Sequence, residues 1–135
     1  MNFQILAIAL GGATGALARY GVGTLVHKTW MPFGVYTGTF IANSLGCFIM
    51  GLAFVYFDLK YSALTSSNEA LVAIRQFCMI GFLGAFTTYS SFSLDAFKML
   101  QQGQIFHWGI YIFSTLIVSI VSLMIGVFIA KFLLT

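Results

Sequence analysis

Four long stretches that hold almost no charged side chain divide this chain, and they constrain its fold more than any other feature. A helix needs about 20 mostly apolar residues to cross the hydrocarbon core of a bilayer. The four stretches are residues 2–26, 29–57, 76–94 and 99–130, and each approaches or exceeds this length. Arg19 is the only charged residue within them. We therefore predict an all-α integral membrane protein with four transmembrane helices per chain, near residues 3–27, 33–57, 68–100 and 105–133.

The composition excludes the soluble and the disordered classes of protein. Hydrophobic residues make up 60% of the chain and charged residues only 7%, whereas about 25% of the residues in a soluble domain are charged. A disordered chain would combine low hydrophobicity with high charge. Because the four helices use most of the 135 residues, we expect one membrane domain, 1–135, and no extramembrane domain. No catalytic triad, metal-ligand spacing or phosphate loop is recognisable in the sequence, so we do not expect an enzyme.

The six basic residues are scattered singly, which argues against nucleic-acid binding. Four helices would put three of them on one side of the membrane, Lys60, Arg75 and Lys131, and three on the other, Arg19, Lys28 and Lys98. Such a balance is typical of chains that insert in both orientations, although in a short chain a few residues can also decide one orientation. A chain of dual topology can form an antiparallel two-fold homodimer.

The ends of the predicted helices carry helix-boundary signals. Pro32, at the end of the run Trp30–Pro32, suits the start of the second helix, because its missing N–H costs nothing there. The run Ser66–Glu69 matches a capping box at the start of the third helix. Gly103 lies in the turn between the third and fourth helices, where we expect it to end the third.

Small residues in the first predicted helix indicate close helix packing. Gly11 and Gly15 form a GxxxG pair, and such pairs let membrane helices approach closely. Gly12, Gly15, Arg19 and Gly23 share one helical face by their spacing. A guanidinium within lipid is costly, so Arg19 either reaches the membrane interface or faces a wet vestibule that attracts anions.

Polar residues recur at helical spacing in the second and fourth predicted helices. The second carries Tyr36, Thr39, Asn43 and Gly46 on one face, and the fourth carries Tyr111, Thr115, Ser119, Ser122 and Gly126. A polar side chain at membrane depth either holds two helices together by hydrogen bonds or lines a path for a polar solute. The spacing leaves both interpretations open.

The third predicted helix carries the densest polar run. Six of the seven residues from Thr87 to Ser93 bear a hydroxyl group, and Gly84 comes just before them. Hydroxyl side chains compete for backbone hydrogen bonds, and glycine adopts unusual backbone angles. The run is therefore typical of a helix that is broken within the membrane, and equally of a continuous helix with a polar stripe. A break is tolerated only where it is buried in protein or lines a cavity.

Three segments together resemble the Fluc/CrcB family of fluoride channels, and the likeness covers essentially the whole chain. They are Ala18–Tyr20, Gly38–Asn43 and Gly81–Ser93, of which the last is the most specific. The resemblance implies an antiparallel, dual-topology homodimer with two fluoride pathways, in which the third helix is broken. It also implies a structural sodium ion at the dimer centre, held by the backbone carbonyls of Gly84 and Thr87 of both subunits.

The resemblance also assigns residues to the fluoride pathway. The paired phenylalanines of the family fall on Tyr89 and Phe92, so this chain departs from the family at the first position. Its pore asparagine falls on Asn43, and its polar track falls on Tyr111, Thr115 and Ser119. Thr39 adds a hydroxyl donor, and Arg19 is expected at an anion-attracting vestibule.

The implied function is passive fluoride export across the plasma or inner membrane of a bacterium. Asp58, Glu69 and Asp95 lie at or near the ends of the predicted helices, which argues against proton coupling through a carboxylate. One alternative is a small dual-topology multidrug transporter, but that class relies on a carboxylate in its first helix and this chain has none before Asp58. The other alternative is a non-transporting membrane subunit, in which the polar stripes only join helices.

Overall fold

The computed structural model describes residues 2–26, 33–63 and 69–134, and every regular element within these ranges is helical. The elements are α1 (Asn2–Val26), the 3-10 turn η1 (Gly34–Tyr36), α2 (Thr37–Ala63), α3 (Glu69–Arg75), the π-helix η2 (Gln76–Leu83), α4 (Gly84–Phe86), α5 (Tyr89–Gln101) and α6 (Ile105–Leu134).

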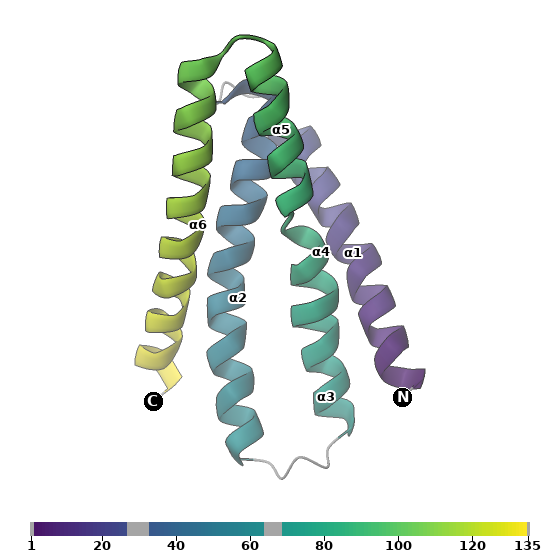
Figure 1. Cartoon of the computed structure of the whole chain (residues 1–135). Coiled ribbons are helices and arrows are strands. Elements are labelled where there is room, and N and C mark those ends of the chain that lie inside the picture. Colours follow the sequence, from purple (N-terminus) through teal and green to yellow (C-terminus); the bar gives the residue numbers. More distant parts are fainter. Residues whose placement is uncertain (1, 27–32, 64–68, 135) are drawn as a thin grey trace.

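These elements form four helical spans that are long and apolar enough to cross a membrane, Phe3–Val26, Gly34–Leu59, Glu69–Gln101 and Ile105–Leu134. The prediction of an all-helical protein with four such spans is therefore confirmed. The spans stand side by side, and α3, η2, α4 and α5 follow one another along the third (Figure 1). In Figure 1, α2 and α6 both run away from the end that carries the α5–α6 turn, and the third span returns to it.

The second helix differs from its prediction at both ends. It begins with the 3-10 turn η1, and α2 continues to Ala63 instead of ending at residue 57. Charged residues limit the part of a helix that can lie in hydrocarbon, but they do not interrupt its backbone hydrogen bonds, so α2 extends past Asp58. The boundary signals at residues 30–32 and 66–68 lie outside the described residues.

Gly103 ends the third span as predicted. Its φ is +71°, which is the left-handed conformation that glycine adopts without steric cost. Its N–H donates to the Leu100 carbonyl at 3.0 Å, and the Gln104 N–H donates to the Met99 carbonyl at 3.0 Å. The chain therefore reverses tightly between α5 and α6.

Glycines allow α1 to pack directly on η2. A Cβ atom at Gly15 would collide with the Phe82 carbonyl oxygen, and one at Gly11 would collide with the Phe77 carbonyl oxygen. The close packing predicted from this GxxxG pair is confirmed. Gly12 shares the predicted glycine face, but nothing lies within 4 Å of a Cβ built on it. Only part of that face is therefore an interhelical contact.

The α2–α6 pair packs in the same way on the other side of the bundle. A Cβ atom at Gly51 would collide with the Leu123 carbonyl oxygen, and one at Gly126 would collide with the Phe48 carbonyl oxygen. The backbones of α2 and α6 thus approach closely along these glycines. This contact aligns the polar face of α2 with the polar stripe of α6.

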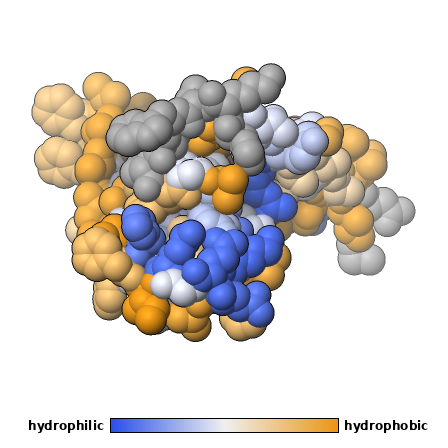
Figure 2. All heavy atoms as spheres, turned by 90° about the horizontal axis from the view of Figure 1, so that it is seen from above, coloured by the Kyte–Doolittle hydropathy of each residue, from blue (hydrophilic) through white to orange (hydrophobic). Residues whose placement is uncertain are grey.

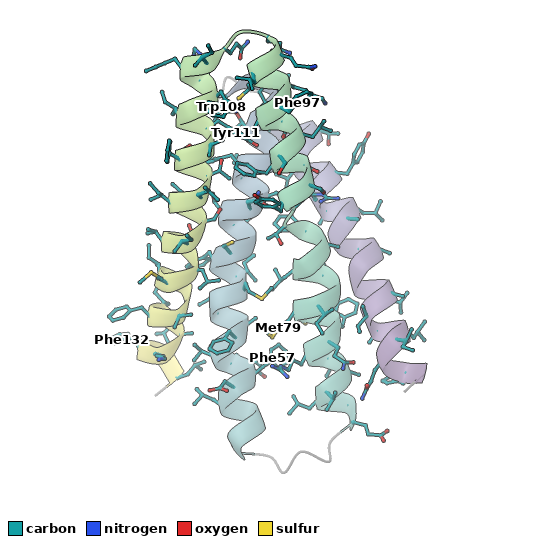
Figure 3. The ribbon with its side chains drawn as sticks, in the orientation of Figure 1. Phe57, Met79, Phe97, Trp108, Tyr111 and Phe132 are labelled. Atoms are coloured by element: carbon teal, nitrogen blue, oxygen red, sulfur yellow. The ribbon has the colours of Figure 1, made fainter. Side chains whose placement is uncertain are left out.

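The outer surface is apolar along the spans and polar at one end. Seen from the end that carries the α5–α6 turn, hydrophilic residues gather in one patch and hydrophobic residues surround it (Figure 2). Phe132 points away from the bundle, whereas Tyr111 points inward from α6 (Figure 3). Their side chains are 81% and 0% exposed, respectively. The distribution is that of a membrane protein, whose lipid-facing surface is hydrophobic.

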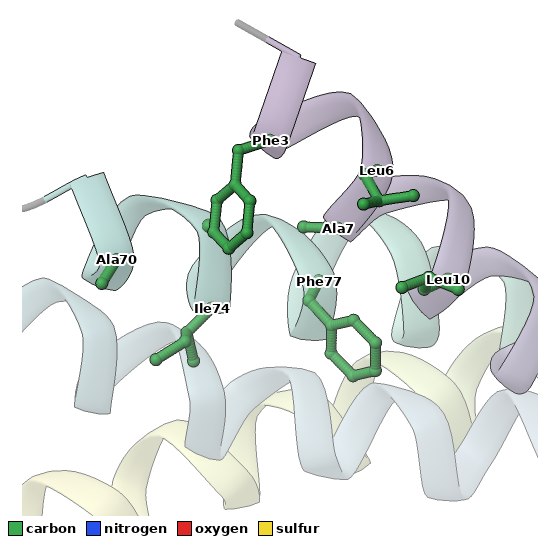
Figure 4. Close-up of a pocket in the computed structure, with 8 residues that line it drawn as sticks. Phe3, Leu6, Ala7, Leu10, Ala70, Ile74 and Phe77 are labelled. Carbon is green, nitrogen blue, oxygen red and sulfur yellow. The ribbon is translucent and has the colours of Figure 1, made fainter.

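One groove in this surface has only apolar lining. It lies between α1 and the α3–η2 segment (Figure 4) and is formed by Phe3, Leu6, Ala7, Leu10, Ala70, Ala73, Ile74 and Phe77. These side chains offer no hydrogen-bond donor or charge to a polar solute. The groove is therefore typical of a lipid-facing surface and does not form part of the candidate site.

Candidate functional site

The candidate site is built around two extended residues between α4 and α5. Thr87 has φ −82° and ψ 153°, and Thr88 has φ −153° and ψ 121°. The Thr87 N–H still donates to the Leu83 carbonyl at 3.0 Å. The Thr88 hydroxyl oxygen accepts the Ser91 N–H at 3.1 Å and caps the start of α5. The Thr88 side chain thus accepts a backbone N–H that the interruption leaves without its helical partner.

Asn43 holds this interruption from the neighbouring helix α2. Its Oδ1 accepts the Thr88 N–H at 2.7 Å, and its Nδ2 donates to the Thr88 carbonyl oxygen at 3.1 Å. Asn43 is 9% exposed and Thr88 is 8% exposed. Gly46 lies one turn further along α2, where a Cβ atom would collide with the Thr87 methyl group. The polar face of α2 therefore packs against the interruption.

Asn43 was predicted as a hydrogen-bond donor in the pore, and in the structure it also bonds to the backbone of Thr88. Each carboxamide has one acceptor oxygen and two N–H hydrogens. Asn43 uses the oxygen and one hydrogen on Thr88. The other hydrogen is the group that Asn43 can offer to a solute. The mid-span position of Asn43 had already indicated interhelical hydrogen bonding as an alternative.

The Asp95 carboxylate connects α2, α5 and α6 on the α5 side of the interruption. Asp95 of α5 accepts a hydrogen bond from the Thr39 hydroxyl of α2 at 2.6 Å and a weak one from the Tyr111 hydroxyl of α6 at 3.5 Å. Asp95 is half-buried. It was not among the predicted site residues, because the sequence placed it near the end of the third helix. Its spacing of three residues from Phe92, which puts both on one helical face, was the available signal.

The polar stripe of α6 contains buried hydroxyl groups without partners. Tyr111 is fully buried and Thr115 is 3% exposed. The hydroxyl oxygens of Thr115 and Ser119 are buried, and neither forms a hydrogen bond with a nitrogen or oxygen atom of the described residues. A buried hydroxyl that lacks a partner costs free energy. Such groups are therefore suited to a solute or water that supplies the missing partner.

Two aromatic rings link the interruption to this stripe. The centroids of Phe92 and Tyr111 lie 5.5 Å apart, and those of Tyr89 and Phe92 lie 5.7 Å apart. Phe92 is 6% exposed, but Tyr89 is 76% exposed. The structure thus brings Phe92 into the core with Tyr36, Ala96, Met99 and Tyr111. Tyr89 extends from the same helix to the surface of the chain.

The remaining predicted residues lie apart from this cluster or contribute only backbone. Arg19 is half-buried on α1, and no hydrogen bond or ion pair joins it to the site within the described part of the chain. Gly84 begins α4 and Thr87 follows it. The described residues contain no group of three or more histidine, cysteine or acidic residues that would hold a metal ion.

Comparison with known proteins shows the family to which the chain belongs. Residues 6–127 match the family model described as CrcB-like protein, Camphor Resistance (CrcB). Proteins named fluoride-specific ion channel FluC from Hydrogenovibrio crunogenus, Rhizobium etli and Helicobacter acinonychis are 34%, 36% and 36% identical to it. The alignments cover 95%, 95% and 97% of this chain and 91%, 96% and 98% of those proteins. With its four membrane-spanning helices, the chain is a multi-pass membrane protein that belongs to the CrcB family.

Proposed function

We propose that this protein is a fluoride channel that lets the ion leave the bacterial cytoplasm passively across the plasma or inner membrane. The names of its relatives support a fluoride channel. The observation in the structure that carries the proposal is the buried Thr115 hydroxyl, which has no partner among the described residues. Thr115 lies one helical turn along α6 from Tyr111, whose ring packs against that of Phe92. A channel of this kind performs transport and is not an enzyme.

Fluoride must exchange the water of its hydration shell for other hydrogen-bond donors, and the described side chains offer such donors. Thr39, Tyr111, Thr115 and Ser119 carry hydroxyl donors, and Asn43 retains one amide hydrogen. Aromatic rings have a positive edge, so Phe92 and Tyr89 meet an anion edge-on. No lysine or arginine lies among these groups to trap the ion. Conduction requires binding that is weak enough for release.

Asp95 keeps the binding of an anion weak. Its carboxylate accepts the same Thr39 and Tyr111 hydrogens that fluoride needs. An entering ion therefore has to compete with the carboxylate for those donors, and it feels the repulsion of a like charge. The hydroxyl hydrogens are at the same time held in place before the ion arrives. The contacts of Asp95 with Thr39 and Tyr111 support this role, whereas the sequence placed the carboxylate only near a helix end.

The path is completed by a second copy of the chain in the opposite orientation. The exposed ring of Tyr89 beside the buried ring of Phe92 supports this part of the proposal, because one chain covers only half of the aromatic pair. Closed two-fold dimers are the commonest oligomers, and the even distribution of basic residues suits dual topology. In this dimer the extended Thr87 and Thr88 lie within the membrane as the break in the third helix. Two fluoride pathways result, one for each Phe92.

A sodium ion at the centre of the dimer would be held by the carbonyl oxygens of Gly84 and Thr87 from both subunits. Carbonyl oxygens freed at a broken membrane helix suit a cation such as sodium. The residues present fit this ion, because the N–H groups that would close an α-helix onto these two carbonyls bond to Asn43 and Thr88 instead. The ion would join the two subunits. Arg19 is proposed at the vestibule, where its charge attracts anions.

The alternatives have less support. A small multidrug transporter would need a carboxylate in α1, and the sequence of this helix holds none. In a non-transporting subunit the stripe of α6 would only join helices. Hydroxyls that join helices are hydrogen-bonded, and that of Thr115 is not, within the described residues.

Fluoride efflux from proteoliposomes tests the proposed function. Liposomes that contain the purified protein and are loaded with potassium fluoride are expected to release fluoride when valinomycin removes the opposing voltage, because the channel is passive. A fluoride electrode records the release, and liposomes loaded with chloride are the control for selectivity. No fluoride release, or an equal release of chloride, would contradict the proposal.

Replacing Thr115 with valine separates a pathway role from a packing role. Valine has nearly the shape of threonine but no hydroxyl, so the variant loses one donor to the ion, worth about 1.5–3 kcal/mol for a charged partner. We expect fluoride efflux to fall about tenfold or more while the melting temperature stays the same or rises. Ser114→Ala is the matched control, because the Ser114 hydroxyl donates to a backbone carbonyl of its own helix, that of Tyr111. A lower melting temperature with unchanged efflux would identify Thr115 as a packing residue.

A further inference from the structure

We propose that the side chains of Asn43 and Thr88 are positioning residues for the cation site, because they divert two backbone N–H groups away from the carbonyls of Gly84 and Thr87. This inference rests on the proposed function, in which those carbonyls bind sodium. It assigns the pathway asparagine a role in cation binding that is separate from its contact with fluoride.

The first diversion concerns the carbonyl of Gly84. In a continuous α-helix the N–H of each residue donates to the carbonyl four positions earlier, so the Thr88 N–H would bond to Gly84. In the structure this N–H donates to Asn43 Oδ1 at 2.7 Å instead. The carbonyl of Gly84 therefore lacks its α-helical donor and keeps its lone pairs for another partner.

The second diversion concerns the carbonyl of Thr87. Its α-helical donor would be the Ser91 N–H, which bonds to the Thr88 hydroxyl oxygen at 3.1 Å. The two affected carbonyls are three residues apart, and so are the two diverted N–H groups. One side chain from α2 and one from the interruption itself thus free both carbonyls that the proposed cation requires.

Asn43 also fixes the direction of the freed segment. Its Nδ2 donates to the Thr88 carbonyl at 3.1 Å, so the carboxamide pairs with both backbone groups of one extended residue. Both residues are at least nine-tenths buried, where water cannot replace a lost hydrogen bond. Without the carboxamide, the Thr88 N–H would have the Gly84 carbonyl as its nearest alternative along the chain, and a helical bond there would remove a cation ligand.

The melting temperature of the purified protein in detergent, measured as sodium replaces N-methylglucamine at constant ionic strength, tests this inference. A ligand that binds the folded state raises its stability with concentration, so we expect the wild-type protein to melt at higher temperature as sodium increases. In Asn43→Ala and in Thr88→Val, the sodium concentration for half of this rise should increase at least tenfold. Thr88→Ser keeps the hydroxyl and should restore the wild-type response.

Ser44→Ala is the matched control for Asn43. The Ser44 hydroxyl lies on the same helix but donates to the backbone carbonyl of Phe40 at 2.8 Å. Its loss should therefore leave the sodium response unchanged. If Asn43→Ala does not fold, the comparison of Thr88→Val with Thr88→Ser decides alone. Variants that melt at lower temperature but keep the wild-type sodium midpoint would overturn this inference and leave the sodium site standing. A wild-type protein without any sodium response would overturn both, whatever its fluoride efflux.

Discussion

Replacing Phe92 with isoleucine is expected to reduce fluoride efflux from proteoliposomes to the background leak of protein-free liposomes. The Phe92 ring is buried and lies against both Tyr89 and Tyr111. Isoleucine fills a similar volume, and such exchanges usually cost less than about 1.5 kcal/mol of stability. It has no ring and hence no positive edge for an anion. The effect should therefore appear in transport and not in folding.

The control for this variant is Phe97→Ile on the same helix. Phe97 is 55% exposed and takes no part in the ring cluster, so its replacement should leave efflux near the wild-type rate. Both variants should elute from a size-exclusion column at the wild-type position. Wild-type efflux in Phe92→Ile would show that the Phe92 ring does not line the pathway.

Replacing Gly15 with alanine is expected to have the largest effect on folding, with a loss of roughly 3 kcal/mol or more, the upper end of the cost of overpacking. The added Cβ would collide with the carbonyl oxygen of Phe82, which is backbone and cannot rotate away. The helix α1 would have to move off η2 to accept it. The melting temperature in detergent and the yield of monodisperse protein measure this loss.

Gly12→Ala provides the matched comparison, because it makes the same chemical change on the same helix. Nothing lies within 4 Å of a Cβ at Gly12, and alanine favours a helix over glycine by about 1 kcal/mol. We expect this variant to melt at or slightly above the wild-type temperature. If Gly12→Ala and Gly15→Ala lowered the melting temperature equally, the close contact between α1 and η2 would not be the cause.

Most of the fold follows from local properties of the sequence. The charge-poor stretches predicted four spans, because burial in hydrocarbon depends on each residue's own polarity. Gly103 ends its helix, and Gly11 and Gly15 mediate packing, for reasons that lie in their missing side chains. The end of α2 was placed too early, since a charge such as that of Asp58 limits membrane burial without breaking a helix.

The candidate site could be predicted only in part. Spacing put Tyr111, Thr115 and Ser119 on one face, and the resemblance to a known family selected Asn43 and Phe92. The sequence left open whether each hydroxyl joins helices or faces a path, because that depends on a partner from another helix. For Asp95 it offered only the helical face shared with Phe92, because the contacts of Asp95 with Thr39 and Tyr111 connect residues 56 and 16 positions apart.

The sequence by itself determined that this protein has four membrane-spanning helices, which of their faces are polar, and where small residues permit close packing. These properties depend on residue type and on the helical repeat alone. Only the tertiary structure decided that Asn43 bonds to Thr88 and that the Thr115 hydroxyl has no hydrogen-bond partner among the described residues. Hydrogen bonds between helices depend on the register and distance of two backbones, which are set by contacts such as that of Gly51 with Leu123 and are not encoded in either helix alone.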